Sequence, residues 1–230
     1  MKKVLPVLVA IVLVAGMVSA QELKQPPVIS APAGKAPSDA IVLLDGTSLR
    51  EWQHTDGSAA KWDLQGGAMV VKKGTGGVMT KKEFGDMQLH LEFATPSEVV
   101  GEGQGRGNSG VYLQGVYEVQ VLDSYENETY PDGMLGAVYQ QYIPLVNAAR
   151  KPGEWQTYDF IFRAPRFGAG GKVTEKAVVT VILNGVLIQD HIKIAPTPGG
   201  IRDNEAPTGP IFLQDHGNPT RFRNIWVREL

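Results

Sequence analysis

The chain has no cysteine and only four histidines among its 230 residues. It can therefore form no disulfide, and its stability must come from a hydrophobic core. No two histidines have the spacing of a zinc site. Charge is also scarce, because 22 basic residues face 24 acidic ones and the net charge is −2. Such a weakly acidic chain has no field that would hold nucleic acid or anionic lipid, so we expect neither as a partner.

Long apolar runs are absent except at the start of the chain. Two lysines precede an almost unbroken apolar run over residues 4–18, and Val18-Ser19-Ala20 forms a small-residue cleavage site. The run is too short for a typical membrane span, so we predict a signal peptide over residues 1–20 and a mature chain that begins at Gln21. We therefore expect a periplasmic or secreted protein with no membrane span in its mature chain.

The next segment, residues 21–39, contains four prolines and no apolar periodicity. Such a composition predicts an extended linker. The domain then covers residues 40–230, a length that suits a single all-β unit. No internal repeat occurs at a fixed period, which argues against a propeller or a solenoid.

Alternation of apolar and polar residues dominates the rest of the chain. In residues 86–93 every second side chain is apolar, which is typical of a half-buried antiparallel strand. Nine further segments have a similar strand character: 41–44, 68–72, 110–114, 117–122, 156–163, 177–183, 186–194, 211–214 and 221–228. Asn184-Gly185 predicts a tight type I′ hairpin between two of them. The sequence thus predicts an all-β fold of two packed antiparallel sheets, a β-sandwich or jelly roll.

A glycine-rich loop precedes one of the central strands. Residues 105–110 match the dinucleotide-binding fingerprint, but they lie between two predicted strands and no helix follows to face a phosphate. A nucleotide site is therefore excluded. Two interpretations are left, a flexible connection or a loop over a sugar site in which Arg106 and Asn108 donate hydrogen bonds.

The segment 117–123 carries a set of polar side chains at strand spacing. Glu118 and Gln120 project from one face while the intervening valines face the core. A one-residue bulge near Leu122 would bring Asp123 beside them. The spacing is similar to the acid-x-acid-x-x-acid strand of laminarinase-type β-glucanases, but an amide in the middle position argues against ordinary double-displacement hydrolysis. The alternative is a merely polar outer face of a sandwich strand.

A second polar group follows another predicted strand. There Asp215 and His216 stand beside each other at a strand end, where the histidine could act as a general base or a metal ligand, or simply stabilise a turn. A divalent cation such as calcium, held by Glu118, Asp123 or backbone carbonyls, is a further alternative.

From about Leu43 to Leu230 the chain resembles the 3-keto-disaccharide hydrolase domain family. Short matching segments occur in order along the chain: Leu43-Leu44-Asp45-Gly46-Thr47-Ser48-Leu49 with Trp52, Asn108-Ser109-Gly110-Val111, Tyr117-Glu118-Val119-Gln120-Val121-Leu122-Asp123, Gly136-Ala137-Val138-Tyr139, Lys151-Pro152-Gly153-Glu154-Trp155, Leu183-Asn184-Gly185, Leu213-Gln214-Asp215-His216-Gly217 and Phe222-Arg223-Asn224-Ile225. Gln114 departs from the pattern, since many relatives carry arginine a few residues after the Asn-Ser-Gly turn. The resemblance implies a concanavalin-like jelly roll that acts on glycosides oxidised to a ketone at C3.

The implied reaction has a simple chemical logic. A C3 ketone acidifies the C2 proton, so a modest base can remove it, the group at C1 can leave by elimination, and water can then add. Glu118 or His216 would be the base, and a bound cation could polarise the ketone. The remaining candidates are sugar contacts, with Arg106, Asn108 and Gln120 holding the sugar and its enolate, together with Asp123, Tyr139, Asp215 and Arg223.

Two other functions compete with catalysis. A non-catalytic, lectin-like carbohydrate-binding module could use the same fold and groove without turnover. A structural or adhesion domain of the cell envelope would have no defined polar pocket. A small carbohydrate is the expected partner in the first two cases.

Overall fold

A computed structural model describes residues 25–230, so the predicted signal peptide over residues 1–20 lies outside the described residues. The described chain consists of strands joined by loops and three short 3₁₀ turns, η1 (Gly103–Gly105), η2 (Pro131–Gly133) and η3 (Ala169–Gly171). Within this range no helix has the length and apolar character to cross a membrane.

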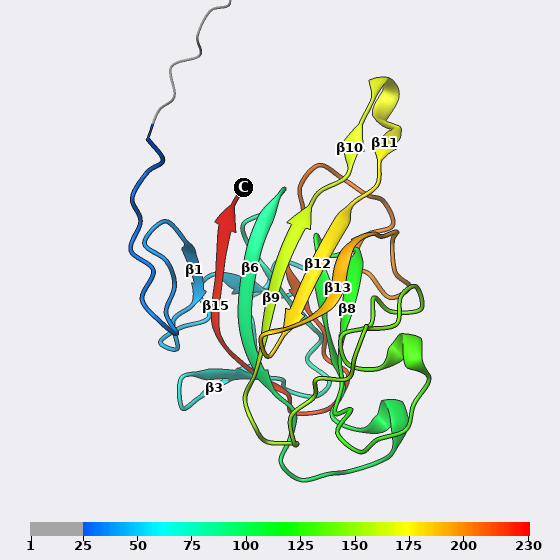
Figure 1. Ribbon diagram of the computed structural model, residues 1–230. Coiled ribbons are helices and arrows are strands. Elements are labelled where there is room, and N and C mark those ends of the chain that lie inside the picture. The colour runs from blue at the N-terminus through cyan, green and yellow to red at the C-terminus, as the bar shows by residue number, and fades with distance from the viewer. Residues whose placement is uncertain (1–24) are drawn as a thin grey trace, which may run out of the picture.

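The strands form two antiparallel sheets and a separate hairpin. Sheet A has the order β13-β12-β9-β6-β15-β4-β3, with β1 also paired to β15; its members are β1 (Ile41–Leu44), β3 (Asp63–Gln65), β4 (Ala68–Val70), β6 (Met87–Ala94), β9 (Gln156–Arg163), β12 (Val178–Leu183), β13 (Val186–Lys193) and β15 (Arg221–Glu229). Sheet B has the order β2-β5-β14-β7-β8; its members are β2 (Trp52–Gln53), β5 (Val78–Thr80), β7 (Ser109–Leu113), β8 (Tyr117–Val121) and β14 (Phe212–Leu213). Figure 1 shows the long strands of sheet A side by side, with β8 behind them.

The hydrophobic core lies between the two sheets. Alternate residues of β6 and β9 are fully buried, because one face of each strand packs on the core while the other faces outward. Sheet A contributes large aromatic side chains such as Phe93 and Phe160, and sheet B contributes Val111, Val119 and Val121. The predicted two-sheet β-sandwich is therefore confirmed.

The ten predicted strands are all present, with ends that shift by at most two residues. The Asn184-Gly185 turn is also present, with φ angles of 54° and 81° that type I′ geometry requires. Five strands of two or three residues were missed, namely β2, β3, β5, β10 (Arg166–Phe167) and β11 (Val173–Glu175). Such short pairings have too few residues for a period-two pattern, and β10 and β11 form a hairpin that projects from the sandwich (Figure 1).

The C-terminal half of the predicted linker is not simply extended. The Ser38 N–H donates to Ser30 O at 2.8 Å, which closes a loop beside sheet A. Asn224 of β15 donates to Gly34 O, and Arg228 forms an ion pair with Asp39. The expectation of an extended tether is therefore corrected for residues 30–39, because polar groups of β15 bind this segment.

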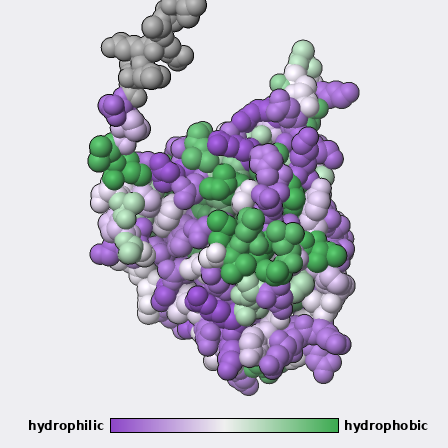
Figure 2. All heavy atoms as spheres, in the orientation of Figure 1, coloured by the Kyte–Doolittle hydropathy of each residue, from purple (hydrophilic) through white to green (hydrophobic). Residues whose placement is uncertain are grey.

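The outer face of sheet A is shown in Figure 2. Apolar side chains gather in its centre and polar ones surround them. Ile161, Val186 and Leu187 are exposed apolar residues of its strands. The cavity described next belongs to the other sheet.

Candidate active site

Two neighbouring strands of sheet B supply the polar floor of the candidate site. β7 and β8 pair antiparallel, with Tyr112 opposite Glu118 and Gly110 opposite Gln120. Because side chains alternate along a strand, these residues face away from the core that their valine neighbours enter. Gly110 is required here, since a β-carbon at this position would collide with Glu118 Oε1.

A cavity of about 270 Å³ opens above this floor. Its lining comes from both strands and from four loops: Gln104, Asn108, Tyr112, Glu118, Gln120, Tyr139, Pro198, Gly199, Gln214 and His216. Five predicted site residues meet here, namely Glu118, His216, Asn108, Gln120 and Tyr139. The size is slightly below the usual range of small-molecule sites.

Glu118 is the buried acid of this cavity, with only 3% of its surface exposed. None of the ion pairs among residues 25–230 involves it. Burial raises the pKa of Glu118 to about 7, against an opposing hydrogen bond from the Tyr112 hydroxyl. That hydroxyl in turn accepts a hydrogen bond from Gln214 at 3.3 Å. A carboxyl group with a pKa near neutrality can both take up and release a proton.

Asn108 and Gln120 present their amide oxygens as free acceptors. Asn108 Nδ2 donates to Gln104 O at 2.7 Å, and Gln120 Nε2 donates to Gln104 Oε1 at 3.0 Å. Asn108 Oδ1 and Gln120 Oε1 are buried and have no hydrogen-bond partner within the described chain. The expectation that Asn108 donates to a ligand is therefore corrected, because its N–H groups are turned to Gln104.

Tyr139 and His216 complete the cavity from two loops. The Tyr139 hydroxyl bonds to that of Tyr130 at 2.7 Å, and its backbone N–H donates to Glu118 O. His216 is exposed at the rim. Its neighbour Asp215 accepts hydrogen bonds from backbone N–H groups of Gly74, Gly76 and Gly217. Asp215 thus shapes the loop that carries His216 and does not line the cavity.

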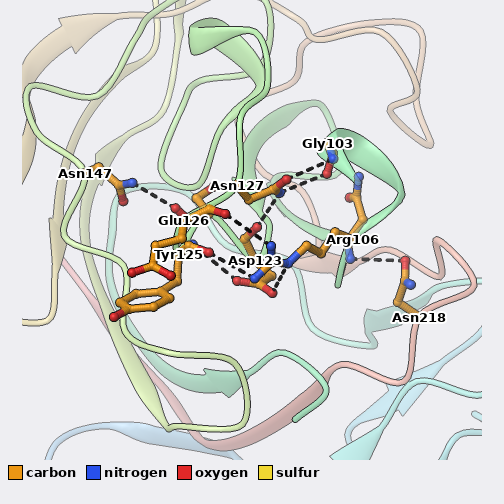
Figure 3. A network of polar contacts seen from close by, with 10 residues as sticks. Gly103, Arg106, Asp123, Tyr125, Glu126, Asn127, Asn147 and Asn218 are labelled. Atoms are coloured by element: carbon orange, nitrogen blue, oxygen red, sulfur yellow. Dashed lines mark hydrogen bonds and ion pairs between the residues drawn. The ribbon is translucent and has the colours of Figure 1, made fainter. Parts of the chain in front are cut away.

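Arg106 and Asp123 form a separate network beside the cavity, shown in Figure 3. Arg106 Nε lies 2.6 Å from Asp123 Oδ2, and the guanidinium also donates to the carbonyls of Tyr125 and Glu126. Neither residue lines the cavity.

The bulge predicted near Leu122 is wrong. The β7–β8 register has no shift. The Asp123 N–H is shared between Gly107 O at 3.2 Å, the partner that an unbroken register gives, and Arg106 O at 3.3 Å. Asp123 therefore turns to Arg106 and does not join Glu118 as a calcium ligand. Across residues 25–230 no three His, Asp or Glu side chains are grouped so that they could hold a metal ion.

Two further positions lie away from the cavity. Arg223 belongs to sheet A, where it pairs with Glu92 at 2.6 Å and stacks on Trp155 with 3.9 Å to the ring centre. Gln114 is buried and donates to the carbonyls of Phe84 and Pro207, so it holds a loop next to the sheet.

Sequence reasoning missed several lining residues. Tyr112 could have been found, because pairing the two predicted strands about their turn places it opposite Glu118. Gln104 and Gln214 gave no such signal, since their roles depend on contacts between segments distant in the sequence.

Comparison with known proteins agrees with this fold. Residues 39–228 match the model of the 3-keto-alpha-glucoside-1,2-lyase-like domain. A provisionally assigned glycosyl hydrolase from Parabacteroides distasonis is 46% identical, with a TM-score of 0.83 over 92% of this chain and 95% of that one. A second such protein from that organism is 19% identical, with a TM-score of 0.63 over 84% of this chain and 94% of that one, and shows the fold alone. The search of curated proteins gave no match. The chain therefore belongs to the 3-keto-alpha-glucoside-1,2-lyase-like domain family, whose members are carbohydrate-active and glycosyl hydrolase-like.

Proposed function

We propose that the protein cleaves 3-keto-glycosides by elimination followed by hydration. The observation that carries this proposal is Glu118, a buried carboxyl group at the floor of a polar cavity that has no charged partner among residues 25–230. Burial brings its pKa to about 7, which suits removal of a moderately acidic proton at neutral pH. The family to which the chain belongs supports the same chemistry.

The reaction balances without a covalent glycosyl-enzyme. Glu118 takes the proton from C2, and the electron pair of that C–H bond forms an enolate with the C3 ketone. The enolate then collapses to a C1–C2 double bond, the C1–O bond breaks, and the leaving oxygen takes up a proton. Water adds its oxygen to C1 and a proton returns to C2, so the net reaction is hydrolysis.

Of the two proposed bases, the geometry favours Glu118 over His216. Glu118 lies on the cavity floor beside the two amides, whereas His216 is an exposed rim residue. His216 can instead protonate the leaving oxygen, because the aglycone must extend toward the open side of the cavity.

The test compares a 3-keto-disaccharide with its unoxidised parent in deuterated water. We expect release of the aglycone from the keto form alone, with deuterium at C2 of the product. Equal cleavage of both without deuterium at C2 would indicate a conventional glycosidase. Binding without cleavage of either would favour the lectin-like carbohydrate-binding module.

We also propose that the protein is exported and that its mature chain begins at Gln21. The basis is the apolar run and the small-residue site at Ala20. Mass spectrometry of the exported protein should find this N-terminus. An intact Met1 on exported material would contradict the proposal.

A further inference from the structure

Gln104 occupies the centre of the η1 turn, in the glycine-rich loop that covers the cavity. Its side-chain nitrogen donates to Gly133 O and to Thr129 Oγ1, both at 2.8 Å. A backbone carbonyl can only accept, so the amide group that faces Gly133 must be the NH₂ group. The orientation of the Gln104 side chain is therefore fixed, with Oε1 directed the other way.

This orientation determines that of the Gln120 amide, and the backbone carbonyl of Gln104 determines that of the Asn108 amide. Gln104 Oε1 accepts from Gln120 Nε2 at 3.0 Å and from Asn108 Nδ2 at 3.4 Å. The Gln104 carbonyl also accepts from Asn108 Nδ2 at 2.7 Å. Asn108 Nδ2 thus uses both of its hydrogens on Gln104, and Gln120 Nε2 uses one of its two, so both side-chain nitrogens are held by Gln104 and the amide oxygens of Asn108 and Gln120 point away from it.

Those two oxygens have the properties of a preformed recognition site. Asn108 and Gln120 each expose only 2% of their surface, and both line the cavity. Their oxygens lack a hydrogen-bond partner anywhere in the described structure. A buried acceptor without a partner is unfavourable, so a ligand that donates to both oxygens gains most.

We propose that Gln104 is a positioning residue that makes the cavity selective for a sugar with two hydroxyl donors on the side of Asn108 and Gln120. A group that only accepts hydrogen bonds is disfavoured there. A C3 ketone is such a group, so it must face another donor of the cavity, such as the hydroxyl of Tyr139. This inference rests on the proposed function only in taking a keto-sugar as the ligand.

The experiment replaces the hydroxyls of the 3-keto-disaccharide one at a time by fluorine, which cannot donate a hydrogen bond. In the wild-type protein we expect two of the fluorinated compounds to show KM values raised roughly tenfold or more, and the others to change little. This comparison uses the wild-type protein alone, so it does not depend on whether a variant folds. If no fluorinated compound, or every one, loses affinity to the same extent, the proposal is overturned.

Variants then assign the selectivity to Gln104. In Gln104→Met the Gln120 amide is free to rotate, whereas Asn108 still donates to the backbone carbonyl of residue 104. The KM penalty of one of the two sensitive compounds should therefore fall to about threefold or less, and that of the other should persist. The matched control is Gln65→Met, at an exposed position of β3. A uniform loss of affinity for all compounds in Gln104→Met would show a merely structural role.

The outcomes separate this inference from the proposed reaction. If the keto compound binds with the expected fluorine pattern but is not cleaved, measured as dissociation constants by calorimetry, the reaction proposal fails and the selectivity stands. If cleavage occurs with no fluorine pattern, the reaction stands and the selectivity fails. Absence of any sugar binding contradicts both.

Discussion

Two buried carboxyl groups of one chain segment differ in whether a charged side chain lies beside them. Glu118 and Asp123 are each 3% exposed and lie five residues apart. Asp123 has Arg106 at 2.6 Å and also accepts from the Tyr125 N–H. Glu118 has no charged partner among the described ion pairs and only the Tyr112 hydroxyl to stabilise its anion.

This difference indicates that Asp123 has a structural role, whereas Glu118 is available for chemistry. Burying a charge costs free energy unless a counter-charge compensates it, and Arg106 compensates Asp123. At Glu118 the cost is not compensated, and it appears as a pKa raised to about 7. An uncompensated carboxyl in a cavity is a common feature of functional sites.

Removing Asp123, the carboxylate that Arg106 neutralises, should have a large effect on stability. Asp123→Ala leaves the Arg106 guanidinium without its partner in a part of the structure where its side chain is 14% exposed. The free energy of unfolding should fall by about 3–5 kcal/mol, the usual loss when one member of a buried pair is removed. Urea denaturation measures it. Asp39→Ala breaks an exposed pair with Arg228 and serves as the control, with a much smaller change expected. Equal losses would show that the Arg106–Asp123 pair is not structurally important.

The raised pKa of Glu118 should make the stability of the protein depend on pH. The pKa of Glu118 is about 7 in the folded protein against 4.5 for an ordinary glutamate, so folding favours its neutral form. The stabilisation is complete below pH 4.5 and is lost as the pH rises through 7, where ionisation costs up to about 3 kcal/mol.

Glu118→Gln removes that ionisation. We expect its melting temperature to exceed that of the wild-type protein at pH 8.5 and to equal it near pH 4, as measured by thermal denaturation across this range. Asp123→Asn is the matched control and should be less stable than wild type at pH 8.5. A Glu118→Gln variant that is destabilised at every pH would mean that the carboxyl group is structural.

The Glu118→Gln substitution should also reduce catalytic activity. Glu118→Gln should lower kcat by about 10² or more, the scale of losing a positioned base. His216→Asn should cost less, because the rim histidine is exposed and only assists the leaving group. Steady-state kinetics on a 3-keto-disaccharide measures both. A larger loss in His216→Asn would identify the histidine as the base and reverse the assignment.

The sequence predicted the fold better than the site, for a physical reason. Strands such as β6 alternate because one face is always buried, so a local pattern reports a global environment. The same alternation along a strand predicted that Glu118 and Gln120 lie together on one face. It could not show that Arg106 and Asp123, 17 residues apart, pair with each other rather than with a ligand.

The hydrogen-bonding roles of the Asn108 and Gln120 amides could not be predicted from the sequence for the same reason. Whether Gln120 offers a donor or an acceptor depends on the side chain of Gln104, whose own orientation depends on Gly133. No residue pattern within one segment contains that information. Site residues were therefore predictable by position on a strand but not by hydrogen-bonding role.

The Tyr112 hydroxyl should have a smaller influence on activity than Glu118 itself. Its hydrogen bond to Glu118 favours the ionised carboxyl and so lowers the Glu118 pKa against the larger effect of burial. In Tyr112→Phe the pKa should rise further, and the ascending limb of the kcat/KM–pH profile should move to higher pH. The ring should stay in place because it packs edge-on against Phe212 with 5.4 Å between ring centres.

The loss should therefore occur at and below the pH at which Glu118 titrates, and disappear above it. The hydrogen bond is worth about 1 kcal/mol, so activity should fall severalfold near pH 7 and approach the wild-type value near pH 9. Tyr117→Phe is the control, because its hydroxyl binds Glu205 and its ring belongs to the core. That variant should leave the limb where it is. A limb that stays fixed in Tyr112→Phe, or moves to lower pH, would mean that a group other than Glu118 controls the proton transfer.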